Sequence, residues 1–456
     1  MGLTRASTLA GILLLLSCAP AGDTQQRHPA FEPLRDSLQR HEPQPIYDPD
    51  PSHPWNRVFH LLFTRTVEAR LGAIVPGPVF AASDERTALS SRTVTRVESG
   101  DRAIDPLYPA WVWLGGVPGG STDGADWVLR DPQYSDLGDA LEAVASTASK
   151  QSVLARALMQ ADLWAAYDVL HASLSRLLRP SSDRASHRPQ RAERMLDLLA
   201  AAIRALALTR SAIGALPATF AAARSAQGLP DLFNPRSGWI EIRWFDNRMH
   251  ERDVQDRRAA RVFFKPSWQP TDVPAFLARF RDGQGAHSSA LEAAALVIQN
   301  LLIASDGTVV PSPITYDVQL RRFDARSASD RPAVLQYELS RQLLLGSPET
   351  GGLRPLDQDA PAYLPSAGND LSFATPSFLR PGAAPLLVPL RQRCASCHGP
   401  RLDHLFTFSR VTAPGVEPPR VVALDASQHR HAWDVAARKM ASESWKALER
   451  QWTNTR

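Results

Sequence analysis

The chain has few cysteines, no long apolar run beyond its N-terminal region and little excess of charge. Three cysteines occur in 456 residues: Cys18, Cys394 and Cys397. After residue 17, no apolar run approaches the roughly 20 residues that a membrane-spanning helix needs. Basic and acidic residues number 51 and 47, a formal charge of +4, and almost all the basic residues are arginine. Because there is no dense basic run and no interleaved aromatic platform, nucleic acid is not expected as a partner.

Familiar catalytic patterns are also absent. The sequence has no serine nucleophile elbow, no His-Glu-x-x-His pattern and no phosphate-binding loop. The glycines at 115, 116, 119 and 120 lack the Gly-Lys-Ser/Thr ending of such a loop. One polar cluster in the second half of the chain is best interpreted as the solvated connection of a hairpin. Its members are Asp246, Arg248, His250, Glu251 and Asp253.

Two of the three cysteines belong to a short pattern near the C-terminus. Cys394 and Cys397 are followed directly by His398, which gives Cys-x-x-Cys-His. Thiols at this spacing form thioethers to the vinyl groups of haem, and the adjacent imidazole binds the iron. A zinc ribbon would need a second pair of ligands, and no other cysteine lies nearby. A redox dithiol usually ends a strand of a βαβ unit, whereas the residues before Cys394 are rich in proline.

The pattern therefore predicts one covalently attached haem c. Cys394 and Cys397 are the expected anchors, and His398 is the expected proximal iron ligand.

The N-terminus carries an export signal. Arg5 precedes an apolar run over 9–16, which is too short to span a membrane and is typical of a signal peptide at 1–17. The junction 15–18, Leu-Leu-Ser-Cys, resembles the bacterial lipobox. That resemblance implies cleavage before Cys18 and lipidation of its thiol, so that acyl chains anchor the protein to a membrane. An ordinary cleavable signal with an unrelated cysteine is the alternative.

The two predictions support each other. With one thiol assigned to lipid and two to haem, none remains for a disulfide. In bacteria, covalent haem attachment takes place outside the cytoplasm, which is where an export signal sends a protein. We therefore expect an exported, membrane-anchored lipoprotein, either periplasmic or on the outer surface.

Length and composition fit two or three domains with a sizeable core, since 44% of the residues are hydrophobic. Helices and strands are predicted without strict alternation, which favours an α+β fold. The body is expected to be rich in helix, with short strands or a hairpin, and the haem-binding region at the C-terminus small and mainly α. The expected divisions are a signal peptide (1–17), a Pro-rich tether (18–54), an α+β body (55–348, helical over 137–227 and mixed over 236–345), a loop-rich linker (349–385) and the haem region (386–456).

Hydrophobic periodicity predicts the elements of the body. A helix is expected from Trp55, and two or three helices over 137–227, broken at 180–189. Strands over 239–245 and 261–264 are expected to form a hairpin. Further along, the pattern predicts a short helix over 274–280, a longer apolar helix over 288–304 and a strand over 309–323.

The region 386–456 resembles a small class I cytochrome c domain. The resemblance rests on Cys394, Cys397 and His398, on the Gly-Pro that follows them and on a helix-forming C-terminus. It implies a sixth iron ligand, which in that family is a methionine from a loop before a terminal helix. Prolines at 385 and 389 leave little room for the short helix that precedes the motif in the family.

Several side chains compete for the role of sixth ligand. Met440 is the only methionine after the motif, but it also falls on the apolar stripe of one long helix predicted over about 433–452. His404, His429 and His431 are the alternatives to it. Two further candidates, His171 and Met195, lie near apolar helical faces, where a core role is more common.

Three functions fit this pattern. The first is an electron-carrying cytochrome that docks redox partner proteins. The second is a haem enzyme or gas sensor whose iron keeps an open sixth position. The third is a binding or structural lipoprotein in which haem stabilises the core. Electron transfer is favoured, because one attachment site without a catalytic constellation is the minimum that it needs.

Overall fold

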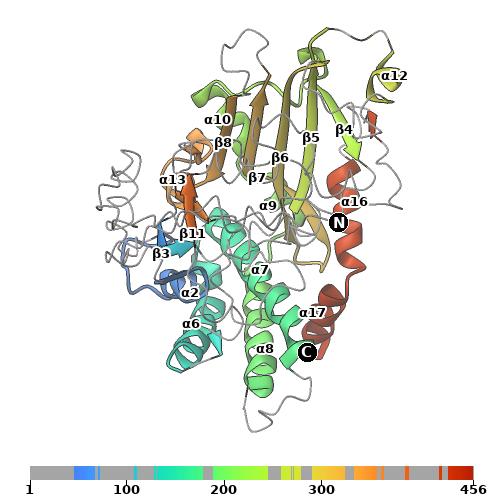
Figure 1. Cartoon of the computed structure of the whole chain (residues 1–456). Helices are drawn as coiled ribbons and strands as arrows, with labels where there is room; N and C mark the ends of the chain where they lie inside the picture. Colours follow the sequence, from blue (N-terminus) through green and yellow to red (C-terminus); the bar gives the residue numbers. More distant parts are fainter. Residues whose placement is uncertain are drawn as a thin grey trace, which may run out of the picture.

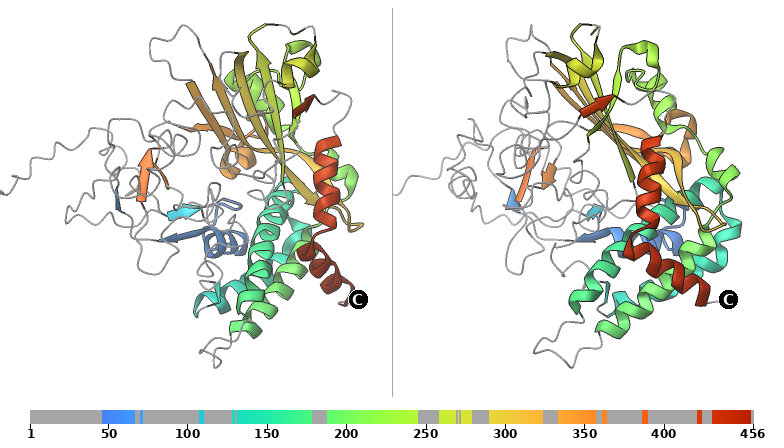
Figure 2. Two further views of the ribbon diagram at one scale, coloured as in Figure 1. Left: turned by 45° about the vertical axis from the view of Figure 1, so that its right-hand side comes forward. Right: turned by 90° about the vertical axis from the view of Figure 1, so that its right-hand side faces the viewer.

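The protein is described by a computed structural model over residues 46–66, 70–71, 107–109, 128–129, 131–177, 188–244, 258–268, 270, 272–278, 290–323, 333–356, 361–363, 386–389, 421–423 and 430–454. These residues form helices and antiparallel sheet, so the predicted α+β class is confirmed (Figure 1). A group of helices packs against one end of a large sheet (Figures 1 and 2). None of the described helices is both long enough and apolar enough to cross a membrane.

Three long helices form most of the helical part. They are α6 (Gln133–Thr147), α7 (Val153–Leu177) and α8 (Arg188–Leu206). The predicted helical stretch is therefore confirmed, and its expected break falls between α7 and α8. The helix α2 (Pro54–Phe63) packs on α6, and α6 and α7 both pack on α8. The helix α7 contacts α8, β6, α2, α13 and α17, so most of its surface is buried. Its apolar residues are accordingly spread around the helix and not confined to one face.

Seven strands form the large sheet, in the order β12-β4-β5-β6-β7-β8-β9, with every neighbouring pair antiparallel. Their bounds are β4 (Ile240–Trp244), β5 (Arg258–Pro266), β6 (Leu291–Ile303), β7 (Val309–Arg322), β8 (Ala333–Leu339), β9 (Leu353–Leu356) and β12 (Val421–Ala423). The strands β4 to β9 follow one another along the chain as a meander, and the predicted β4–β5 hairpin is confirmed. The edge strand β12, which comes from a later part of the chain, pairs with β4.

The remaining elements are short. The short helices are α9 (Arg210–Gly214), α10 (Thr219–Gln227), α12 (Val273–Ala278) and α13 (Arg341–Gly346), with 3-10 turns η2 (Ala148–Lys150), η3 (Pro235–Ser237) and η5 (Pro348–Thr350). Two small sheets pair β1 (Thr64–Thr66) with β3 (Leu107–Pro109), and β11 (Leu386–Pro389) with both β10 (Pro361–Tyr363) and β2 (Arg70–Leu71). The expected short helix over 274–280 is observed as α12, which covers part of the sheet through Phe276 and Leu277.

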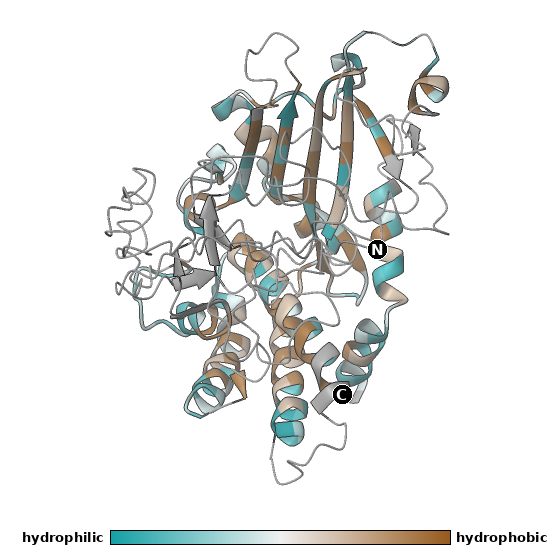
Figure 3. Cartoon of the chain, in the orientation of Figure 1, coloured by the Kyte–Doolittle hydropathy of each residue, from teal (hydrophilic) through white to brown (hydrophobic). Residues whose placement is uncertain are grey.

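The prediction of an apolar helix over 288–304 is wrong, because residues 291–303 form the strand β6. Its residues alternate: Ala293, Ala295 and Val297 are buried in the main core, whereas Ala294 and Leu296 are only half-buried. Both sets are apolar, so the sequence lacks the polar residues that would reveal a period of two. Figure 3 shows this apolar character along β6.

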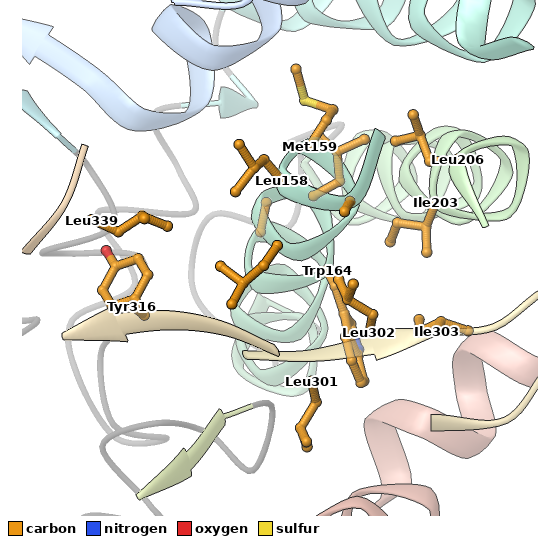
Figure 4. Close-up of a cluster of buried hydrophobic side chains, with 14 of the residues drawn as sticks. Leu158, Met159, Trp164, Ile203, Leu206, Leu301, Leu302, Ile303, Tyr316 and Leu339 are labelled. Atoms are coloured by element: carbon orange, nitrogen blue, oxygen red, sulfur yellow. The ribbon is translucent and has the colours of Figure 1, made fainter. Parts of the chain in front are cut away.

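The main core lies where α7 meets the ends of β6 and β7 (Figure 4). It includes Leu158, Trp164 and Ile303, each of which is at most 2% exposed to solvent. Gln160 of α7 is also buried, and its side-chain amide binds the backbone of Ile303 as a neighbouring strand would. Its Nε2 donates to the Ile303 carbonyl at 3.0 Å, and its Oε1 accepts from the Ile303 amide at 2.8 Å. The helix is thus fixed to the end of the sheet without leaving these two polar groups unsatisfied.

Two helices, rather than the single long one expected, end the chain. They are α16 (Arg430–Met440) and α17 (Glu443–Asn454). The break falls at Ser442, whose hydroxyl accepts a hydrogen bond from the Trp445 amide at 3.3 Å, as an N-cap does. α16 contacts β5 and β7, and α17 contacts α7 and α8. The described C-terminal helices therefore pack into the same core as the body, with Val435, Trp445 and Leu448 among its members.

Gly351 supplies a test of how α10 is attached. It has φ +75°, and a Cβ at this position would overlap the carbonyl oxygen of Thr219 in α10. We expect Gly351→Ala to lower the free energy of unfolding by about 3 kcal/mol or more, from left-handed strain plus overpacking. Gly307→Ala is the matched control, because φ is +81° but nothing lies within 4 Å, so only the strain of about 1–2 kcal/mol should appear. Urea unfolding measures both, and equal losses would contradict this packing.

Candidate functional site

The Cys-x-x-Cys-His pattern lies between two strands that belong to different sheets. Cys394, Cys397 and His398 are outside the described residues, as is Cys18. The preceding strand, β11, ends at Pro389 in the three-stranded sheet, and the following strand, β12, begins at Val421 on the edge of the large sheet. An extended chain advances at most about 3.6 Å per residue, so Cys394 cannot lie further than about 18 Å from Pro389.

The donor set matches what covalent haem attachment requires. Two thiols three positions apart suit the two vinyl groups, and the imidazole of the next residue suits the iron. Among the described residues, no group of three or more His, Cys, Asp or Glu side chains is arranged to hold a metal ion. On the chemistry of its side chains, the pattern at 394–398 is the candidate cofactor site of this chain.

Of the four candidate sixth ligands that follow the motif, two lie on α16, and the structure separates them. His431 is in its first turn and Met440 is its last residue. At 1.5 Å per residue the nine positions between them span about 13 Å along the helix axis, so a single iron cannot bind both. The other two candidates, His404 and His429, lie outside the described residues.

The Met440 end of α16 is attached to α7 by a buried ion pair. The ammonium of Lys439 lies 2.9 and 2.8 Å from the two carboxylate oxygens of Asp168, and 3.0 Å from the Ser444 hydroxyl. The side chains of Lys439 and Asp168 are 2% and 5% exposed. The same ammonium lies 5.3 Å from the ring centroid of Trp164. Such a pair is strongly destabilising to break, because either charge left alone would be buried without compensation.

Met440 itself packs against the main core. Close to it along the chain, Trp445 of α17 meets Trp164 of α7 with ring centroids 5.9 Å apart, and Trp452 meets Trp445 at 5.8 Å. The indole of Trp452 donates to the Ala200 carbonyl of α8 at 2.8 Å. This end of α16 therefore lies in a continuous aromatic and aliphatic packing region.

The two candidates in the helical part have core positions. Met195 of α8 is completely buried in the main core. His171 of α7 is half-buried and stacks on Tyr167 with ring centroids 6.1 Å apart. Burial lowers the pKa of His171, and the nearby Lys439 acts in the same direction while Asp168 opposes it. The helical spacing that favours a packing role for both residues is consistent with these positions.

A second buried polar cluster was not predicted. Asp162 of α7 forms an ion pair with Arg341 of α13, in which the Arg341 Nε donates to Oδ2 at 2.7 Å and a second nitrogen donates to Oδ1. The hydroxyl of Tyr47 donates to the same Oδ2 at 2.9 Å. Burial, reinforced by Asp162, raises the pKa of Tyr47 well above its ordinary value. The carboxylate thus joins three parts of the chain that are distant in sequence.

Tyr316 of β7 extends this cluster toward the sheet. The guanidinium carbon of Arg258 lies 3.5 Å from its ring centroid and that of Arg341 lies 6.0 Å away. Burial raises the pKa of Tyr316 to about 12, although both guanidinium groups act to lower it. We interpret the cluster as a structural junction, since both carboxylate oxygens of Asp162 accept hydrogen bonds.

One feature of the sequence could have indicated both buried clusters. Asp162 and Asp168 lie among the buried apolar residues of α7, and an acidic residue in such a place requires a buried partner. Their partners are 179 and 271 residues away, so the sequence pattern does not identify them. The polar residues expected on the hairpin connection, Asp246, Arg248, His250, Glu251 and Asp253, lie outside the described residues.

The Asp168–Lys439 pair generates a stability prediction. Asp168→Ala should lower the free energy of unfolding by about 3–5 kcal/mol, because it leaves the Lys439 ammonium buried and unpaired. The double change Asp168→Leu with Lys439→Met should recover most of that loss, since apolar side chains can replace a buried pair. Lys446→Met is the control, because the Lys446–Glu443 pair is exposed and its loss should be barely measurable. Urea unfolding that shows equal effects for Asp168→Ala and Lys446→Met would contradict the prediction.

Comparison of the chain with protein-family models, with curated proteins and with solved structures finds no match. The residues of this chain with the clearest chemistry are Cys394, Cys397 and His398.

Proposed function

We propose that the protein is an exported c-type cytochrome, anchored to a membrane by lipid, which carries one covalent haem and transfers electrons to or from redox partner proteins. The observation that carries the proposal is the sequence Cys394-Ala-Ser-Cys397-His398. Cys394 and Cys397 would hold the haem, and His398 would bind its iron from one side. The bound haem supplies a one-electron couple.

The described fold supports a carrier in which the body positions the haem-bearing segment. Both ends of the segment are fixed by strand pairing, through β11 on one side and β12 on the other. The chain after it returns to the core through α16 and α17. A cofactor bound at 394–398 would thus lie, along the chain, between two strand-paired segments. Nothing in this arrangement requires a substrate pocket.

The same N-terminal sequence that predicts export supplies the anchor. Residues 1–17 have the features of a signal peptide, and the junction at Cys18 resembles a lipobox. Each buried methylene of an acyl chain contributes about 0.8 kcal/mol, so more than one chain on Cys18 would hold the protein stably to a membrane. Of the Pro-rich segment 18–54, residues 18–45 would then separate the folded body from the lipid surface, whereas Tyr47 already lies in the main core.

The first test concerns the haem. Protein produced in a strain that attaches haem to exported cytochromes should keep its colour through denaturation and acid-acetone extraction, because thioether bonds survive both. The double change Cys394→Ala with Cys397→Ala should remove the colour, whereas Cys18→Ser should not. The reduced wild type should be low-spin and almost unchanged by carbon monoxide, because a carrier keeps both axial positions of its iron occupied.

Two outcomes would count against this function, and they differ in meaning. Pigment that is lost on extraction would refute covalent haem attachment altogether. Rapid binding of carbon monoxide by a covalently attached haem would refute the carrier and favour a haem enzyme or gas sensor with an open iron position. The third alternative, a haem-stabilised structural lipoprotein, would require haem that does not change oxidation state with added reductant.

The second test concerns the anchor. The wild-type protein should be recovered in the membrane fraction, partition into detergent and incorporate labelled fatty acid. Cys18→Ser should release it into the soluble fraction or leave the signal peptide uncut. Fractionation of both forms, with intact mass of the mature N-terminus, measures this. Wild-type protein that is soluble and carries no lipid would overturn the anchor while leaving the haem assignment intact.

A further inference from the structure

We propose that three indoles, those of Trp164, Trp445 and Trp452, form a relay that carries an oxidising equivalent from the core of the protein to its surface. When the innermost ring is oxidised, an electron from the next ring repairs it, and the radical ends on Trp452. The inference goes beyond the proposed function and does not depend on it, because none of the three residues belongs to the Cys-x-x-Cys-His pattern.

The three rings form one continuous series of contacts. The ring centroids of Trp164 and Trp445 lie 5.9 Å apart, and those of Trp445 and Trp452 lie 5.8 Å apart. Both distances are in the range of direct aromatic contact. Because electron transfer between two rings slows steeply as they separate, two short steps through Trp445 are faster than one long step past it.

The series of rings runs from the interior toward the surface. Trp164 of α7 is completely buried among the side chains shown in Figure 4. Trp445 in the first turn of α17 is also buried, whereas Trp452, seven positions further along the same helix, is half-buried. A spacing of seven places both indoles of α17 on one face of the helix. Of the three rings, Trp452 is therefore the one that water reaches.

The surroundings of Trp164 disfavour a radical cation there. Oxidation gives an indole a positive charge, and a completely buried ring holds that charge only at a desolvation cost. The Lys439 ammonium lies 5.3 Å from the ring centroid and repels the charge, although the Asp168 carboxylate bound to it weakens this effect. The N–H of Trp164 has no hydrogen-bond partner among the described residues. No described neighbour therefore stabilises the oxidised ring by accepting a hydrogen bond from it.

The surroundings of Trp452 are more favourable to the radical. Its N–H donates to the Ala200 carbonyl at 2.8 Å, and this hydrogen bond stabilises the oxidised ring more than the neutral ring. Partial exposure lets water solvate the charge and accept the N–H proton. At the end of the relay, Trp452 has lost one electron, which moves through Trp445 to Trp164, and one proton, which goes to water. The external one-electron oxidant that took the first electron is reduced.

Photo-oxidation of the full-length chain tests the relay. A cobalt(III) ammine complex takes one electron irreversibly from an indole excited by ultraviolet light. After air is admitted, peptide mass spectrometry measures the oxygenated product at each tryptophan. Trp433 of α16, which is 48% exposed, is the reference, since direct oxidation should favour it over the half-buried Trp452. The wild type should nevertheless give more product at Trp452 than at Trp433.

A change of the middle ring should interrupt the relay. Trp445→Phe keeps an aromatic side chain in the core, but phenylalanine is much harder to oxidise than tryptophan. The product at Trp452 should fall below that at Trp433, and time-resolved absorption should show an indole radical cation that lasts longer than in the wild type. Trp55→Phe is the matched control, because Trp55 is also completely buried but contacts Tyr47. It should change neither measurement.

Trp452→Phe supplies a second test at a half-buried position, which stays informative if circular dichroism shows that Trp445→Phe does not fold. It should move the product inward to Trp445 and lengthen the life of the radical cation. The inference fails if either relay variant, once folded, leaves the radical cation as short-lived as in the wild type, or if Trp55→Phe has the same effect as Trp445→Phe. Covalent haem decides none of these outcomes, so the cytochrome proposal is tested separately.

Discussion

The carboxylate of Asp162 is the contact on which the arrangement of the described parts most depends. It lies on α7 and binds the guanidinium of Arg341 and the phenol of Tyr47, all of them buried. Through these partners the segment before α2, the central helix and the region after β8 are joined at one point. A carboxylate buried so deeply needs hydrogen-bond donors on both of its oxygens, so the position of each partner is tightly restricted.

The second buried charge on α7, Asp168, extends the same logic to the C-terminus. It holds Lys439, and with it α16 and α17, against the helical part. Gln160 uses hydrogen bonds instead of charge to fix α7 to Ile303 at the end of β6. Three polar side chains of α7 thus determine where α13, α16 and the end of β6 pack against it. Apolar contacts supply most of the stabilisation. Along the chain, the Cys-x-x-Cys-His pattern lies between β11 of the three-stranded sheet and β12 of the large sheet.

The parts that the sequence could predict are those whose signal is local. The helices of 137–227, the β4–β5 hairpin and α12 have their own periodicity or turn residues, and they were predicted within a few residues. β6 was mistaken for a helix because alanine and leucine occupy both of its faces. The break at Ser442 was missed because Trp445 and Trp452 continue the apolar spacing of α16 across it. The pairing of Asp162 with Arg341 depends on the tertiary fold, which no local pattern encodes.

The distance along the chain between α7 and its last partner has a consequence for assembly. Lys439 is synthesised 271 residues after Asp168. At a synthesis rate of ~5–20 residues per second, Lys439 is added roughly ten seconds to a minute after Asp168. Until then, the Asp168 carboxylate lacks the ammonium that neutralises it. Throughout that interval the helical part lacks α16 and α17, and the apolar surface that they will cover remains open. Cys394 and Cys397 are synthesised within the same interval, before the last two helices that complete the core.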